Sequence, residues 1–196
     1  VLDEVIDNLL QLRAPLGVYL VPGNHDYLDN GPELIRRFRD AGLNILVNQS
    51  LVIPHRDCQV LLAGIDFASK PAHLARLVHR TLLNAPPTNG NTVRLLLSHH
   101  PDAFDPACRH GVHLTLSGHT HGGQFVIART NGKRGVIGLG GLAFRYPRGL
   151  YRRGHHYLYV TTGVGSWFPL RVRCPAEIAL LTLRCAPDTL EDASHP

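Results

Sequence analysis

Val18-Tyr19-Leu20-Val21-Pro22-Gly23-Asn24-His25-Asp26 joins a short apolar run to three polar residues of the kinds that bind metals and phosphate. Leu95-Leu96-Leu97-Ser98-His99-His100-Pro101 repeats this arrangement further along the chain. A third run, from His113 to Ser117, leads into Gly118-His119-Thr120-His121-Gly122-Gly123. Short apolar runs of this kind are typical of buried strands, and the turns after such strands carry the sites of open α/β sheets. The sequence therefore predicts a metal-dependent hydrolase whose separate loops converge on one cation.

Helices and strands alternate in the first half of the chain, and strands dominate the second half. Apolar residues at helical spacing predict helices over residues 2–12, 32–41 and 72–83. Residues 128–156 are rich in Gly and Arg and have no clear period, which predicts a long irregular loop. The order of elements favours an α/β fold with layers and a mixed sheet. Strands are predicted over residues 18–21, 44–47, 60–65, 93–98, 113–117, 124–127, 157–162 and 178–183.

The composition is that of a globular protein, with 44% hydrophobic and 18% charged residues in a chain of 196. We predict a single domain over residues 1–196. The sequence has no apolar run long enough to span a membrane and no paired CxxC motif of the zinc-ribbon kind. It contains no methionine and opens within a helical pattern, so we expect that a preceding segment, with any targeting signal, is missing.

The net charge of +5 is unevenly distributed along the sequence. Residues 106–176 include ten Lys and Arg but no Asp or Glu. Within this stretch Arg145, Arg148 and Arg152 alternate with aromatic residues, a mixture that suits a phosphorylated amphiphile at a membrane surface. The same residues could stack nucleic-acid bases, although no nucleic-acid-binding motif is present, or could form only a solvated basic face.

The third turn carries two histidines two residues apart. In an extended strand such residues face the same way, so His119 and His121 would point into one site with Thr120 turned away. Imidazoles suit zinc, iron and manganese, whereas the amide oxygen of Asn24 is a weak ligand that needs stronger donors beside it. This combination predicts a borderline divalent metal.

The segments Gly23–Asp26, Ser98–Pro101 and Gly118–Gln124 resemble, in this order, the later sequence blocks of the calcineurin-like metallophosphoesterases. The resemblance continues through residues 149–151, 159–165 and 171–178 and covers nearly the whole chain. It is strongest to the bacterial branch of cell-envelope phosphodiesterases, which includes relatives that cleave a sugar-nucleotide lipid precursor. It implies a layered α-β-β-α sandwich with mixed sheets, here lacking its N-terminal strands, and a location at the cell envelope or the membrane.

The resemblance also implies roles for individual residues. Asn24, His99 and His119 would bind one of two divalent metal ions (Mn, Fe or Zn), and His121 would bind the other. His25 would face the phosphate, and Asp26 would hold its ring and favour the charged form. A metal-bridging hydroxide would attack phosphorus, and His25 would stabilise or protonate the leaving oxygen.

One feature of the family is missing from the sequence. The Asp-x-His and Gly-Asp blocks, which supply the bridging carboxylate and most of the first metal shell, are absent, so the domain is incomplete at its N-terminus. We expect a phosphodiesterase or pyrophosphatase when the protein is intact, acting on a lipid-linked diester, and weak metal binding with little activity from these residues alone. A nucleotide or nucleic-acid phosphodiesterase and a non-catalytic metal-binding module remain alternatives.

Overall fold

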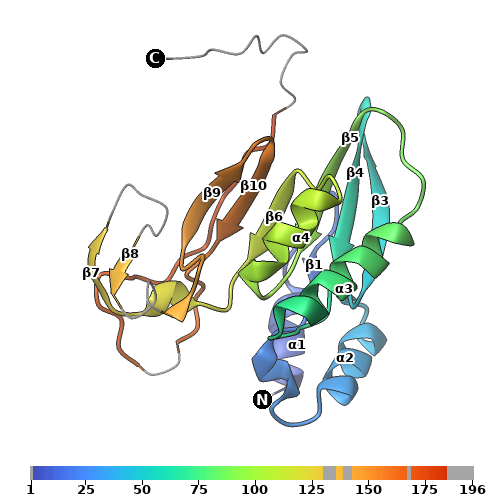
Figure 1. Ribbon diagram of the computed structural model, residues 1–196. Coiled ribbons are helices and arrows are strands. Elements are labelled where there is room, and N and C mark those ends of the chain that lie inside the picture. Colours follow the sequence, from blue (N-terminus) through green and yellow to red (C-terminus); the bar gives the residue numbers. More distant parts are fainter. Residues whose placement is uncertain (1, 130–135, 139–142, 167–168, 185–196) are drawn as a thin grey trace, which may run out of the picture.

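A mixed six-stranded sheet organises the computed structural model, which describes residues 2–129, 136–138, 143–166 and 169–184 (Figure 1). The inner strands β4, β5, β6 and β10 are mutually parallel, and the outer strands β3 and β9 run antiparallel to their neighbours. The parallel strands therefore all end at one edge of the sheet. In spatial order the strands are β3 (Gln49–His55), β4 (Cys58–Gly64), β5 (Thr92–Leu97), β6 (Leu114–Ser117), β10 (His156–Val160) and β9 (Gly149–Arg153).

Helices α3 (Pro71–Leu83) and α4 (Phe104–Arg109) cover one face of this sheet (Figure 1). Ala63, Leu96 and Leu158 lie in one row across the strands and are fully buried under these helices. Leu74 and Val78 of α3 pack into the same core. Apolar burial on this face fixes the strand register, because a slip of one residue would turn the row to the opposite face.

A second, two-stranded parallel sheet consists of β1 (Tyr19–Leu20) and β2 (Asn44–Ile45). Helices α1 (Leu2–Leu10) and α2 (Gly31–Asp40) pack on it through a cluster that includes Ile6, Phe38 and Ile45. The small sheet packs against the large sheet through Val21 and Leu46, which directly follow β1 and β2 and lie against Gly64 of β4. A Cβ atom at Gly64 would lie 2.8 Å from Val21 Cγ1. The layers thus follow the order α-β-β-α, and the predicted fold class is confirmed.

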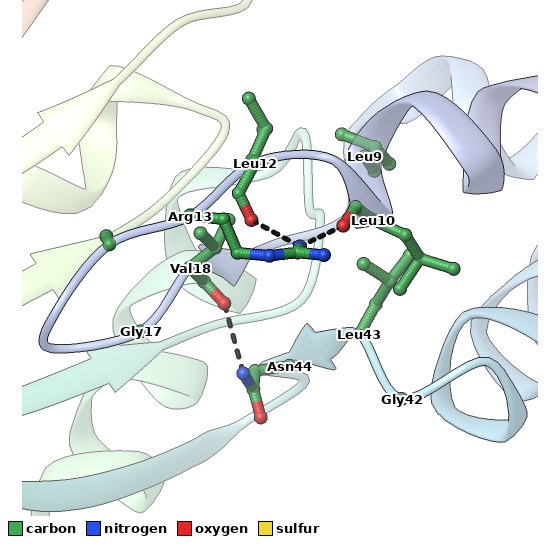
Figure 2. A pocket seen from close by; sticks show the side chains of 10 residues that line it. Leu9, Leu10, Leu12, Arg13, Gly17, Val18, Gly42, Leu43 and Asn44 are labelled. Carbon is green, nitrogen blue, oxygen red and sulfur yellow. Dashed lines mark hydrogen bonds between the residues drawn. The ribbon is translucent and has the colours of Figure 1, made fainter.

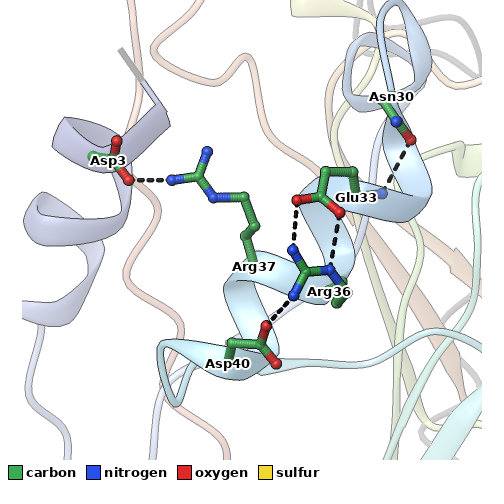
Figure 3. Close-up of polar contacts among 6 residues, drawn as sticks. All are labelled: Asp3, Asn30, Glu33, Arg36, Arg37 and Asp40. Carbon is green, nitrogen blue, oxygen red and sulfur yellow. Dashed lines mark hydrogen bonds and ion pairs between the residues drawn. The ribbon is translucent and has the colours of Figure 1, made fainter.

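Helix α2 is fixed at its ends and along its exposed face by polar contacts (Figure 3). The side-chain oxygen of Asn30 accepts a hydrogen bond from the Glu33 backbone N–H at 3.1 Å, which caps the first turn. Arg36 pairs with Glu33 and Asp40, and Arg37 pairs with Asp3 of α1. Solvent screens these exposed ion pairs, so the apolar cluster contributes most of the stability of this layer.

Several elements differ from the sequence prediction. Strand β9 lies within the stretch 128–156 that we predicted to be irregular, and so does β8 (Val136–Gly138), which pairs with β7 (Val126–Arg129). Strand β3 and helix α4 were not predicted either. The predicted strand over residues 178–183 is wrong, because these residues form no strand within the described part of the chain and Ile178 and Leu180 are 90% and 94% exposed. Their alternating pattern has no partner strand in the described residues.

Candidate metal centre

Three turns at the carboxyl edges of the sheets bring together the side chains of Asn24, His99 and His119. The Asn24 Oδ1 atom lies 2.8 Å from His99 Nε2 and 3.2 Å from His119 Nδ1. The two ring nitrogens are 3.3 Å from each other. These turns follow β1, β5 and β6, so the predicted convergence of separate loops is present in the structure.

The first turn is shaped by a close approach between Gly23 and His99. A Cβ atom at Gly23 would lie 2.9 Å from the Cε1 and Nδ1 atoms of the His99 ring. The backbone N–H of Gly23 donates to Asp26 Oδ2 at 2.7 Å and starts the short 3-10 helix Asn24–Tyr27. Gly23 is therefore needed for space, because its φ of −111° is open to any residue.

The third turn orients its histidines differently from our prediction. Strand β6 ends at Ser117, and His119 and His121 both adopt left-handed backbone conformations, with φ of 67° and 50°. The extended geometry that we used to place their rings together is therefore wrong. Thr120 between them does turn away, since it is fully buried and its Oγ1 donates to the Pro147 carbonyl at 2.6 Å. Left-handed backbone at non-glycine residues is strained, and such strain clusters at functional sites.

The imidazoles of the cluster stay neutral near pH 7. Burial, followed by the charge of His119, lowers the pKa of His99 to about 3. Burial, followed by the charge of His100, lowers the pKa of His119 to about 4. The His100 ring stacks 4.7 Å from the His119 ring, and its Nδ1 accepts a hydrogen bond from the Asp102 N–H. Neutral rings have a lone pair for a metal, whereas imidazolium has none.

His121 lies beside this cluster rather than within it. Its charge adds to the lowering of the pKa of both His99 and His119, which places it nearby. Its Nδ1 is 2.9 Å from the carbonyl oxygen of Gly165. A carbonyl oxygen can only accept, so Nδ1 has the proton and the metal-binding lone pair belongs to Nε2.

The distances within the Asn24, His99 and His119 cluster fit coordination of a single cation. Two ligand atoms about 2.1 Å from one metal, at an angle of about 90 to 110°, are about 3.0 to 3.4 Å apart. The observed separations run from 2.8 to 3.3 Å. Throughout the described ranges, no three His, Cys, Asp or Glu side chains form a ligand set by themselves. The third donor here is an amide oxygen, and the cluster supplies part of a metal shell.

His25 and Asp26 do not form the predicted pair. His25 is exposed at the rim of the cluster, and its charge also adds to the lowering of the pKa of His99 and His119. The Asp26 carboxylate accepts from the Gly23 backbone, and no hydrogen bond joins it to His25. Asp26 therefore shapes the turn that presents Asn24 and His25.

The structure separates the three arginines that we predicted to bind substrate. Arg148 directly precedes Gly149, the first residue of β9. Gly149 pairs with Val160 of β10, and Val160 pairs with Ser117, the last residue of β6, at the edge where the site lies. Arg152 lies near the other end of β9, opposite Tyr157, where it stacks on the ring of that residue. Arg145 forms an ion pair with Asp105 of α4. Four other members of the basic and aromatic stretch, Lys133, Arg134, Trp167 and Phe168, lie outside the described residues.

Two aromatic side chains flank the imidazoles: Phe67, which we did not predict, and Phe144, which belongs to the basic and aromatic stretch of the sequence. The Phe67 ring centroid lies 6.0 Å from those of both His99 and His119. Phe144 packs edge-on against His119 at 5.6 Å. Phe67 closely follows the end of β4, so its strand-end position was a usable signal, whereas Phe144 comes from the stretch that we predicted to be irregular.

A cavity of about 230 Å³ lies between the end of α1 and the segments that lead into β1 and β2 (Figure 2). It is lined by Leu9, Leu12 and Arg13, by Val18, which directly precedes β1, and by Asn44, the first residue of β2. Asn24 follows the opposite end of β1, so the cavity is not part of the candidate metal centre.

Neutral imidazoles and an amide oxygen are donors that suit a divalent metal, and they lie at the carboxyl edge where open α/β sheets bind their ligands. The chain is 31% identical over 174 residues to phosphodiesterase YaeI of Escherichia coli K12, and the match covers 82% of this chain and 56% of that protein. It is 31% identical over 190 residues to the uncharacterized metallophosphoesterase YkuE of Bacillus subtilis 168, with 93% of this chain and 61% of that protein covered. The chain is therefore similar to proteins that are named as a phosphodiesterase and as metallophosphoesterases.

The chain spans about half the length of several curated relatives that it matches. One of them is an uncharacterized metallophosphoesterase of Campylobacter jejuni, which is 32% identical over 193 residues, with 93% of this chain and 46% of that protein covered. No protein-family model and no solved structure matches the chain. A zebrafish relative, 32% identical over 199 residues that cover 94% of this chain and 43% of that protein, is named as a transmembrane protein with a metallophosphoesterase domain. Among the described residues, every helix is too short or too polar to cross a bilayer.

Proposed function

We propose that this chain provides part of the binuclear metal centre of a phosphodiesterase. Asn24, His99 and His119 would bind one divalent cation, and His121 would bind a second through Nε2. The observation that supports this proposal is the mutual approach of one amide oxygen and two neutral imidazole nitrogens to within 3.3 Å. Bound cations would activate water and neutralise the phosphoryl oxygens.

The protein's own groups complete the proposed site. His25, exposed at the rim, would donate a proton to the leaving oxygen of the ester. Arg148 would bind the phosphoryl group, because it lies at the site edge and its Nη1 is buried without a hydrogen-bond partner in the described structure. A buried donor of this kind gains most from an anionic acceptor. Arg145 and Arg152, which contact Asp105 and Tyr157, would contribute less.

The two aromatic side chains beside the proposed metal ligands favour a substrate with an apolar or ring-containing leaving group. Phe67 and Phe144 flank the imidazoles. Such aromatic side chains, in a site that has Arg148 at its edge, suit an amphiphilic diester, such as a sugar-nucleotide lipid precursor at the cell envelope. Peripheral contact with a membrane would follow from such a substrate.

Metal binding and hydrolysis test the proposal together. Metal-stripped protein is titrated with Mn²⁺ and Zn²⁺ by calorimetry, and hydrolysis of bis(p-nitrophenyl) phosphate is followed in the presence of Mn²⁺. We expect His99→Ala and His119→Ala to lose at least about 10-fold in metal affinity. The matched control is His155→Ala, which alters an exposed histidine in the turn between β9 and β10. Parent-like metal affinity in the His99 and His119 variants would contradict the proposed ligands.

Arginine substitutions then test the substrate side. We expect Arg148→Gln to raise the KM for the diester about 10-fold, whereas Arg152→Gln leaves it within about 2-fold, because only Arg148 lies at the site edge. Equal effects of the two substitutions would refute the assignment. Competition by lipid-linked and nucleotide diesters separates the two substrate classes.

A non-catalytic metal-binding module is the second candidate. The sequence contains no Asp-x-His or Gly-Asp block, and the resemblance assigns most of one metal shell to these blocks. Metal binding that depends on His99 and His119, without hydrolysis of any diester tested, would favour this module over the enzyme.

A further inference from the structure

The guanidinium of Arg171 makes hydrogen bonds to several residues of the loop that follows β10. Its Nη2 donates to the carbonyl oxygens of Thr162 at 3.0 Å and Gly163 at 3.3 Å, and also to that of Gly165. Its Nη1 donates to the carbonyl oxygens of Cys174 and Pro175, and its Nε donates to Ser166 Oγ at 3.1 Å. One side chain thus contacts both arms of the loop.

The Gly165 carbonyl connects this arginine to the candidate metal centre. The same oxygen accepts a hydrogen bond from Arg171 Nη2 and one from His121 Nδ1. A carbonyl has two lone pairs and can accept both hydrogen bonds. A second connection runs through Cys174, whose Sγ donates to the His121 carbonyl at 3.3 Å while its own carbonyl accepts from Arg171.

We infer that Arg171 is a positioning residue for His121: it places the Gly165 carbonyl so that His121 has its proton on Nδ1 and presents Nε2 to a metal. Groups that orient a ligating histidine through its other ring nitrogen set its tautomer and direction, and their loss weakens metal binding about 10- to 100-fold. The metal-binding part of this inference rests on the proposed function, whereas the tautomer part does not.

Arg173 offers a matched control on the same loop. It is exposed, and its Nη1 donates one hydrogen bond to the Ile127 carbonyl at 2.7 Å. It therefore has the same charge and lies two residues away, but it makes no contact with the Gly165 carbonyl in the described structure.

The first experiment reads the His121 tautomer in metal-free protein by long-range ¹H–¹⁵N NMR, with the signal assigned by comparison with His121→Ala. We expect a predominantly Nδ1–H ring in the parent and in Arg173→Ala. In Arg171→Gln we expect a mixture with a substantial Nε2–H population, because the acceptor for Nδ1 is no longer fixed. An unchanged tautomer in a folded Arg171→Gln protein would overturn the inference. If this variant unfolds, Arg171→Lys, which keeps the charge but not the forked geometry, provides the same test.

The second experiment is a double-mutant cycle on Mn²⁺ affinity. We expect Arg171→Gln to weaken binding about 10-fold in the parent and to have no further effect in a His121→Ala background. An equal loss in both backgrounds would show that Arg171 acts on the loop as a whole and would refute a role through His121. A chain that binds no Mn²⁺ in any form would refute the proposed function, while the tautomer result would still decide the inference.

Discussion

Replacement of Gly23 by alanine tests the geometry of the candidate metal centre with one added carbon. The new Cβ would lie 2.9 Å from the His99 ring, whereas ordinary contacts begin at 3.4 Å, so the ring has to move by roughly half an ångström or more. Metal ligands tolerate displacements of only about 0.2 Å. We therefore expect Gly23→Ala to weaken Zn²⁺ or Mn²⁺ binding about 10- to 100-fold, which corresponds to about 1.4 to 2.8 kcal/mol.

The same substitution has little reason to unfold the protein. The backbone of Gly23, with φ of −111° and ψ of 178°, is one that alanine adopts without strain. Gly90→Ala is the matched control, because no atom lies within 4 Å of its added Cβ. Calorimetric titration of metal-stripped protein gives the affinities, and urea unfolding in EDTA gives the stability. A folded Gly23→Ala protein whose metal affinity is within about 2-fold of the parent would refute this reasoning.

Two further predictions concern the stability of the metal-free protein. Burial lowers the pKa of His99 to about 3 and that of His119 to about 4, compared with 6.5 in the unfolded chain, so the unfolded state binds more protons below pH 6.5. The urea midpoint in EDTA should therefore fall as the pH drops from 7 to 4, and a His99→Asn/His119→Asn variant that shows an equal fall would contradict this account. Gly122→Ala should lower stability by more than about 2 kcal/mol, because φ is 63° and the new Cβ would lie 2.7 Å from Thr162 Cγ2. Gly111→Ala, with φ of 68° and open space around the Cβ, measures the backbone part alone in the same urea assay.

The sequence predicted the candidate site better than it predicted the strands around it. Asn24, His99 and His119 each follow an apolar run, and the ends of those runs, from β1 of the small sheet and β5 and β6 of the large sheet, lie close together. This prediction needs only the short apolar runs in the sequence and the rule that α/β sheets bind ligands at the carboxyl ends of their strands. We did not predict strand β9, because Gly149, Arg152 and Arg153 give its sequence no alternation of apolar and polar residues. Its strand conformation depends on pairing with β10, which is a tertiary effect.

The roles of the arginines could not be predicted from composition, because register decides them. Arg148 and Arg152 are four residues apart, and in an extended strand this separation corresponds to roughly 13 Å. Their chemistry is the same, but β9 runs antiparallel to β10 and so only Arg148 lies beside the turn that carries His119. Similarly, the partner of Asp26 depends on the 3-10 helix that follows Gly23, which the sequence did not reveal.

The strained turn that carries His119 and His121 is stabilised by residues that do not belong to the proposed ligand set. Three non-glycine residues in this turn, His119, His121 and Gln124, have φ between 50° and 67°. Each such residue costs on the order of 1 kcal/mol or more, so the conformation needs compensating contacts. Thr120 and Gln124 provide them: both are fully buried, and they donate to the carbonyl oxygens of Pro147 and Leu170. These acceptors lie on the segments that lead to Arg148 and Arg171. The backbone that presents the histidines is therefore coupled to the two arginines that we assign to substrate binding and to ligand positioning.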